Sequence, residues 1–273
     1  MQTDTLLTLL RLPSPVEAAV RTKLSSQDTA VIAATAYDQD FPLCRRHSLT
    51  RLAVVIHLLA EKYEVYRSLG VPEDIIADTF RDVTLRATEF WVSHQKAGLT
   101  KDDVIWFRHI MNVHIFKLGS LQFQVFHMVY LDEELLGEPY MVFFDAQKKR
   151  LPTGTDVINC HIPQGADLRS EEVGRSFARA REFFQAVFPE RNFRAFLCYS
   201  WLLYPPMTAL LPESSNIRSF ARRFTIIGTC QDPDQARENL SGNPTTLQKI
   251  AEDHPDKLGF ACGIQAVNAA PHN

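Results

Sequence analysis

The sequence has few cysteines and no long uninterrupted apolar stretch. Its five cysteines are odd in number, widely spaced and free of any CxxC pair. The sequence therefore indicates neither a disulfide framework nor a zinc site, and we expect a reducing, cytoplasmic setting. The most apolar stretch, 52–60, is interrupted by His57. It falls far short of the roughly 20 apolar residues that cross a bilayer, so we expect no membrane segment.

An excess of charge of one sign is also lacking. The 29 basic and 32 acidic residues give a formal net charge of −3. Such a balanced surface has no general attraction for nucleic acid or anionic lipid, which excludes both as expected main partners. The 273 residues are 45% hydrophobic and 22% charged, which is a globular composition with room for two domains. Residues 1–12 lack the basic start and cleavage site of a signal peptide.

Apolar residues at helical spacing dominate the first hundred residues. They predict helices over 48–69 and 72–91, and a third helix that runs from residue 100 to residue 116. Thr100 and Asp103 have the spacing of a capping box at the start of that third helix. We therefore expect a helical domain over 1–104.

Two polar patterns in this helical part are candidate sites. Asp74, Asp78 and Asp82 recur on one helix face, which favours a solvated or domain-facing stripe over a site that attracts a cationic amine. His109 and His114 are five residues apart, so they do not share a helix face as a metal-binding i, i+4 pair does. We expect no metal.

After residue 118 the apolar pattern changes to that of strands. It predicts an α/β domain over 105–273, with a mixed β-sheet flanked by helices. A strand–helix–strand unit in its middle implies a parallel crossover with antiparallel pairs around it, and the first two strands suggest an antiparallel hairpin. The expected strands are 121–131, 140–146, 155–162, 192–203, 224–230 and 258–267, and the expected helices are 170–188, 205–223 and 233–254.

Several long runs of residues carry a family resemblance. They are LGVPEDIIADTFRDV, WFRHIMNVHIFKLGSLQFQ, INCHIPQGADL, SFARAREFF, FPERNFRAFLCYSWLLYP and LLPESSNIRSFARRF. These runs, between about residues 65 and 225, resemble bacterial GNAT-like acyltransferase-domain proteins. Such proteins join a helical N-acyltransferase N-terminal domain to a GNAT-like C-terminal domain.

The resemblance implies transfer of an acyl group from acetyl-CoA or another acyl-CoA to an amine. The acceptor would be a small molecule or a peptide, and the oligomeric state stays open. In GNAT folds two neighbouring parallel strands splay apart and admit the pantetheine arm; here they would be 155–162 and 193–201. The alternative is a non-catalytic GNAT-like module that binds a ligand or a protein.

The same resemblance places the pyrophosphate at the turn 163–170, before a helix. Unpaired N–H groups at a helix start suit an anion. The usual GNAT signature has two glycine-like positions after a Gln or Arg, and this chain departs from it, which favours the alternative module. The cofactor-binding candidates are Gln164, Gly165, Ala166, Arg169 and Ser170.

His161 is the first candidate for catalysis. It ends the strand 155–162 on the face that it shares with Val157 and Asn159. A side chain with a pKa near 6.5 suits a general base for an amine. Its alternative role is to tie down the next loop.

The end of the next strand supplies further candidates. In the resemblance, Tyr204 would protonate the leaving thiolate, although Tyr199 competes for this role and core packing is the alternative for both. Ser200 with His161 would make a serine hydrolase, which the absence of a G-x-S-x-G motif disfavours. Trp201, Ser215 and Asn216 are the candidate substrate contacts, with core packing or loop capping as their alternatives.

Overall fold

The computed structural model describes residues 1–26, 28–131, 141–238 and 245–267. The chain divides into two compact units, Met1–Lys117 and Leu118–Asn273. The boundary that we expect after residue 104 lies within helix α7 (Lys101–Met111), inside the first unit, and it stays a prediction. Within the described ranges, no helix has both the length and the apolar composition to cross a membrane.

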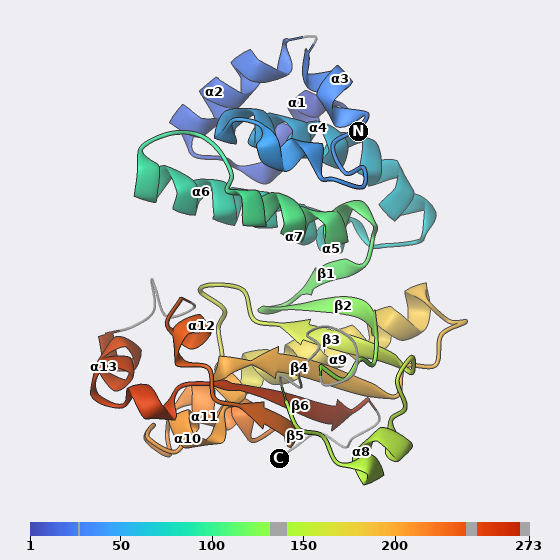
Figure 1. Cartoon of the computed structure of the whole chain (residues 1–273). Coiled ribbons are helices and arrows are strands. Elements are labelled where there is room, and N and C mark those ends of the chain that lie inside the picture. The colour runs from blue at the N-terminus through green and yellow to red at the C-terminus, as the bar shows by residue number, and fades with distance from the viewer. Residues whose placement is uncertain (27, 132–140, 239–244, 268–273) are drawn as a thin grey trace. The chain divides into compact units, whose positions relative to one another are not determined.

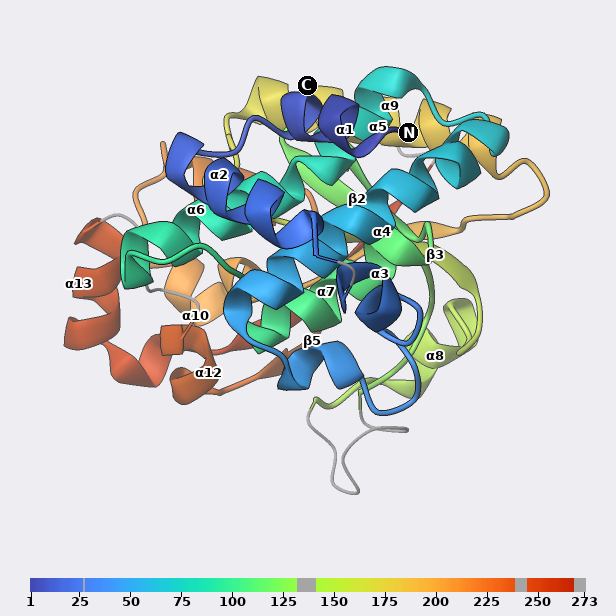
Figure 2. The same cartoon turned by 90° about the horizontal axis from the view of Figure 1, so that it is seen from above.

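The first unit is a helical cluster built around α4 (Ser48–Ser68) (Figure 2). The buried residues of α4 lie on several sides of the helix because it packs against six other helices of this unit. At its C-terminal end the Tyr66 hydroxyl donates a hydrogen bond of 2.9 Å to the Ile110 carbonyl. The remaining elements are α1 (Thr3–Leu10), α2 (Ser14–Leu24), α3 (Asp28–Ala33), the 3-10 turn η1 (Pro42–Arg45), α5 (Glu73–Phe80), α6 (Asp82–His94) and α7.

The last aspartate of the stripe that was expected to be solvated or domain-facing is buried. Asp82 is 5% exposed, and its carboxylate accepts hydrogen bonds from Trp106 Nε1 at 2.8 Å and from Arg86 Nε at 3.0 Å. The helix is interrupted at residue 81, so that Asp82 is the first residue of α6. Arg86 also donates to Asp103 at 2.8 Å. Asp103 forms the predicted capping box with Thr100, which is confirmed.

The second unit carries all of the mixed sheet except most of its first strand, which ends at the unit boundary (Figure 1). Its strand order is β1-β2-β3-β4-β6-β5, which confirms the predicted fold class. β3 and β4 are parallel, whereas β2–β3, β4–β6 and β5–β6 are antiparallel. The strands are β1 (Ile115–Leu118), β2 (Leu121–His127), β3 (Asp156–His161), β4 (Ala195–Ser200), β5 (Thr225–Cys230) and β6 (Phe260–Ala266).

Two predicted elements near the start of the sheet are wrong. β1 occupies the place where we expected the end of a helix, and residues 141–144 form no strand but lead into α8 (Asp145–Arg150). The predicted hairpin partner of β2 is therefore absent, and β2 pairs with β3. Met141 and Phe143 alternate inward as a strand would, but they cover a face of the sheet. The turn of that hairpin lies outside the described residues.

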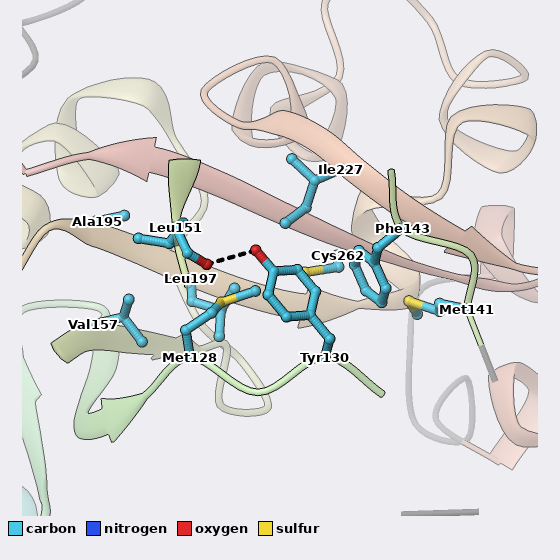
Figure 3. Close-up of a cluster of buried hydrophobic side chains, with 10 residues drawn as sticks. All are labelled: Met128, Tyr130, Met141, Phe143, Leu151, Val157, Ala195, Leu197, Ile227 and Cys262. Carbon is cyan, nitrogen blue, oxygen red and sulfur yellow. Dashed lines mark hydrogen bonds between the residues drawn. The ribbon is translucent and has the colours of Figure 1, made fainter. Parts of the chain in front are cut away.

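Different parts of the chain pack on the two faces of the sheet. On one face the Phe177 ring of α9 (Ser170–Val187) packs edge-on against Phe123 and Phe196. On the other face lies the apolar cluster of Figure 3, in which the Tyr130 hydroxyl donates to the Leu151 carbonyl at 2.7 Å. The helix predicted over 205–223 is two short helices, α10 (Pro205–Thr208) and α11 (Asn216–Ala221). The other elements are η2 (Trp201–Leu203), α12 (Pro233–Glu238), α13 (Thr245–Asp253) and η3 (Pro255–Lys257).

Candidate active site

The parallel ladder between β3 and β4 stops before either strand ends. It pairs Val157 with Ala195 and continues to Asn159 with Leu197, in three residue pairs. β3 nevertheless runs to His161, and β4 runs to Ser200. Each strand keeps its outer neighbour over this stretch, because the β2–β3 pairing reaches His161 and the β4–β6 pairing reaches Ser200. The interruption thus lies at the carboxyl ends of the two parallel strands, where we expect the splay.

A thiol pair lies just beyond the last ladder pair. Cys160 and Cys198 are both buried, and they are the next residues along the two strands. A hydrogen bond with the Cys160 thiol raises the pKa of Cys198, and burial raises it further. Alternation places both thiols on the face that carries Phe196, under α9. The helix side of the interruption is therefore occupied by side chains.

The opposite face of the same strands carries His161 in an array of amides. The register of β2 and β3 places Gln124 opposite Asn159. Gln124 Oε1 lies 2.8 Å from His161 Nε2, and Asn159 Nδ2 lies 3.2 Å from the same nitrogen and 3.5 Å from Gln124 Oε1. His161 is half-buried, so its ring is held by β2 and β3 while part of it stays accessible.

The sequence pattern does not identify Gln124 and Asn159 as neighbours of His161. The alternation in residues 121–131 predicts a half-buried strand, with its glutamines on the polar face. Gln122 and Gln124 are instead 3% and 5% exposed. The only available signal was the position of Asn159, two residues before His161 and hence on the same face. Nothing in the sequence states which residue of another strand faces that pair.

The expected phosphate-facing turn is exposed and well formed. Ala166 N–H donates to the Pro163 carbonyl at 3.1 Å, which closes a tight turn with Gly165 at φ +72° and Gln164 exposed. This left-handed conformation explains the glycine. The helix that follows begins at Ser170, as predicted.

The charges beside this turn are already paired with one another. Arg169 Nε donates to the Asp167 carboxylate at 2.9 and 3.0 Å, and this hydrogen bond lowers the pKa of Asp167. Glu171 and Glu172 stand in the first turn of α9. Arg223 Nη2 donates to the Ser170 carbonyl at 2.8 Å and to its hydroxyl at 3.0 Å. An anion at this turn would therefore compete with carboxylates for Arg169.

Ser200 and Tyr199 are held in structural contacts. Ser200 Oγ accepts a hydrogen bond from Leu202 N–H at 3.1 Å, and alternation directs Ser200 to the face opposite His161. The structure therefore does not bring the two together as a serine–histidine pair. The Tyr199 hydroxyl donates to the Val129 carbonyl at 2.7 Å, which anchors the segment that covers the sheet.

Tyr204 and Trp201 belong to a second apolar cluster. Both are 8% exposed, and the cluster also receives Ile162, the residue after β3. The Tyr204 ring lies against Gly259, where an added Cβ would stand 2.8 Å from Tyr204 Cζ. Among the described contacts, none joins Tyr204 to His161.

Ser215 and Asn216 lie at the start of α11. Ser215 is the N-cap residue and Asn216 is the first helical residue, exposed to solvent. Ser215 N–H donates to the Pro212 carbonyl at 2.9 Å. This geometry is that of a loop entering a helix, and their proposed contact with substrate stays a prediction.

Comparisons with known proteins match both units. The family description "N-acyltransferase N-terminal domain" matches residues 1–113, and "GNAT-like C-terminal domain" matches residues 115–256. No curated protein sequence matches the chain.

Solved structures share the fold of the chain. One is an acyltransferase in complex with decanoyl-CoA and teicoplanin, which is 17% identical with a TM-score of 0.72. Another is an acyltransferase mutant in complex with octanoyl-CoA, with the same identity and TM-score. A third, in complex with decanoyl-CoA, is 20% identical with a TM-score of 0.70. Each match covers 97% of this chain and 87% of the other.

At these identities the solved structures show the fold alone, whereas the two family descriptions together span most of the sequence. The chain therefore belongs to the family of proteins that join an N-acyltransferase N-terminal domain to a GNAT-like C-terminal domain.

Proposed function

We propose that this protein is an N-acyltransferase that moves an acyl group from acyl-CoA to an amine of a small-molecule or peptide acceptor. The observation that carries the proposal is the interrupted ladder between β3 and β4, with His161 at the end of β3. The complexes of the solved acyltransferases with decanoyl-CoA and octanoyl-CoA support the acyl donor. The complex with teicoplanin supports a small-molecule acceptor.

The acyl-CoA would bind along the interruption. Strand edges that have lost their ladder partner offer backbone N–H and C=O groups to the amides of a pantetheine arm. The pyrophosphate would reach the turn 163–170 and the start of α9. Gly165 presents no side chain there, and a Cβ built on it meets no other atom within 4 Å, so the turn is open to a ligand.

The chemistry would be a direct transfer. The amine nitrogen attacks the thioester carbonyl, a C–N bond forms, and the C–S bond breaks. His161 accepts the proton that the amine nitrogen loses. Backbone N–H groups of β4 beyond Leu197 would stabilise the oxyanion. The departing thiolate takes a proton, for which Tyr204, in the apolar cluster beyond β4, is the candidate donor.

Binding and turnover test the proposal separately. Octanoyl-CoA or decanoyl-CoA should raise the melting temperature, because a ligand at 100 times its Kd stabilises by about 2.7 kcal/mol. With a panel of primary amines, each turnover should release one free CoA thiol. His161→Ala should lower kcat by about 10²- to 10⁴-fold and leave the acyl-CoA shift intact. His94→Ala, at an exposed histidine of α6, is the matched control.

The second candidate function is a non-catalytic module of the same fold. The Asp167–Arg169 pair and the acidic first turn of α9 favour it, because these groups oppose a pyrophosphate. This candidate predicts no melting shift with any acyl-CoA. Such a result, at ligand concentrations up to the millimolar range, would overturn the transferase proposal.

A further inference from the structure

The guanidinium of Arg223 lies beside the first turns of α9, although Arg223 itself follows α11 in the chain. Its Nη2 donates to the Ser170 carbonyl at 2.8 Å and to the Ser170 hydroxyl at 3.0 Å. A Cβ built on Gly174 would stand 3.7 Å from the same nitrogen. Ser170 and Gly174 share one face of the helix, because residues four apart are neighbours on its surface. The arginine side chain therefore lies along this face of α9.

The contacts with Ser170 fix one end of the guanidinium and leave its other donors available. A guanidinium has five N–H groups. Those on Nε and Nη1 of Arg223 have no hydrogen-bond partner among the residues that the structure describes. Arg223 is only half-buried, and neither of these nitrogens is fully buried. A ligand that approaches from solvent can therefore reach them.

The positive charge of Arg223 has a second arginine near it and no acid. Burial, and then the charge of Arg181, lower the pKa of Arg223. Arg181 stands about two turns of α9 beyond Gly174, on the same face of the helix. Within the described ranges no carboxylate pairs with either arginine. The two glutamates in the first turn of α9 pair with Arg175 instead.

This arrangement attracts an anion. A cation beside the first turn of a helix faces the positive end of the helix dipole, and a second cation adds repulsion. Guanidinium donors form their strongest hydrogen bonds with carboxylate or phosphate oxygens. The cation that the sequence suggested at this place, Arg169, is instead held by the carboxylate of Asp167. Arg223 is thus the arginine at the start of α9 that has donors free for an anionic ligand.

We propose that Arg223, rather than Arg169, binds the phosphate groups of acyl-CoA. The inference rests on the proposed function and deepens it, because it assigns the side chain that neutralises the donor. Phosphate oxygens accept hydrogen bonds from Nε and Nη1 of Arg223, while Nη2 keeps its contacts with Ser170. Arg181 adds positive potential from its place further along α9. The pyrophosphate and the 3′-phosphate of CoA are the two possible sources of these oxygens.

Donors with and without phosphate groups test the proposal by NMR titration. Arg223→Gln should raise the Kd of octanoyl-CoA by about 10- to 100-fold, the scale of a lost hydrogen bond to a charged group. Octanoyl-pantetheine carries the same thioester but no phosphate, so its Kd should not change in this variant. A general distortion of the site would weaken both donors.

The 3′-dephospho form of octanoyl-CoA distinguishes the two phosphate sources. A loss of affinity that persists with this donor in Arg223→Gln assigns the pyrophosphate as the partner of Arg223. A loss that disappears assigns the 3′-phosphate. Both results support the proposal.

Arg222→Gln is the matched control, because it removes the same charge from the neighbouring residue. Arg222 pairs with Glu213, which keeps a second partner in Arg218. The Kd of octanoyl-CoA in this variant should therefore stay close to that of the wild type. Arg223→Lys keeps the charge but loses the planar donors, so it should recover part of the affinity. The melting temperature of each unliganded variant reports whether it is folded.

An unchanged Kd of octanoyl-CoA in Arg223→Gln, or an equal loss in Arg222→Gln, would overturn the role of Arg223 alone. An equal loss of octanoyl-pantetheine binding would overturn it as well. In all these cases the wild type still binds the donor, so the proposed function stands. Failure of the wild type to bind any acyl-CoA would instead overturn the proposed function, and the role of Arg223 with it.

Discussion

Cys160 of β3 and Cys198 of β4 lie one position beyond the last pair of the parallel ladder, and the neighbouring Cys160 thiol raises the pKa of the buried Cys198. The ladder thus ends before these two residues, whose side chains lie on the α9 face. The opposite face carries His161 and also the apolar cluster of Figure 3. All five cysteines of the chain are free thiols.

Thiol reactivity should follow burial in the native protein. Cys44 and Cys230 are half-buried, and they should react first with iodoacetamide at pH 8. Cys198 and Cys262 should be spared, because the hydrogen bond with Cys160 raises the pKa of Cys198 and burial raises that of Cys262 to about 12. Peptide mass spectrometry after timed labelling checks this, with urea-unfolded protein as the control. Native Cys198 that reacts as fast as Cys44 would contradict it.

Gly165→Ala should weaken both stability and acyl-CoA binding. At φ +72° an alanine is strained by about 1 kcal/mol, which lowers the melting temperature by roughly 2–4 °C in a chain of this size. Its Cβ would also stand where the pyrophosphate is proposed to approach. Gly154 has φ +85° and is likewise open to solvent. Gly154→Ala should therefore lower stability equally, but it should preserve the rise in melting temperature that acyl-CoA causes. Equal acyl-CoA shifts in the two variants would exclude pyrophosphate from this turn.

Arg86→Met should destabilise the helical unit. Arg86 bridges the carboxylates of Asp82 and Asp103, whose side chains are 3% and 11% exposed. Removing the guanidinium leaves two poorly solvated negative charges side by side. This should lower the free energy of unfolding, measured in urea, by about 3 kcal/mol. Arg67→Met removes a pair with Glu73 in which both side chains are more than half exposed, and it should cost less than about 1 kcal/mol. Similar losses in the two variants would contradict the buried network.

The free energy of unfolding should decrease as the pH falls through the range in which histidine becomes protonated. Burial, followed by the charges of Arg108 and His114, lowers the pKa of His109 in the folded chain. Between that lowered pKa and the unfolded value near 6.5 the unfolded chain binds more protons, so the free energy of unfolding falls as the pH decreases. His109→Gln should remove this part of the pH dependence. His94→Gln, on the exposed end of α6, should keep it; identical slopes in both variants would contradict the assignment to His109.

The spacing of apolar residues predicted the long helices and strands well, because this spacing is a local property of the sequence. α4, α9 and the central strands β3 and β4 lie close to their predicted positions, and the capping box at Thr100 is present as expected. The end of α7 was not predictable in this way. There Val113 adopts φ +56°, a conformation that a β-branched residue disfavours, and it is 7% exposed. Tertiary packing holds it there and redirects the chain into β1.

The sequence by itself determined that the second unit is a mixed sheet and that His161 ends a strand on the face of Asn159, since alternation along one strand is a local property. Only the tertiary structure decided which side chain faces that histidine. Gln124 lies 37 residues away along the chain, and the β2–β3 register brings its amide oxygen to the imidazole. Register depends on long-range pairing, and a shift of one residue would have turned the glutamine to the opposite face.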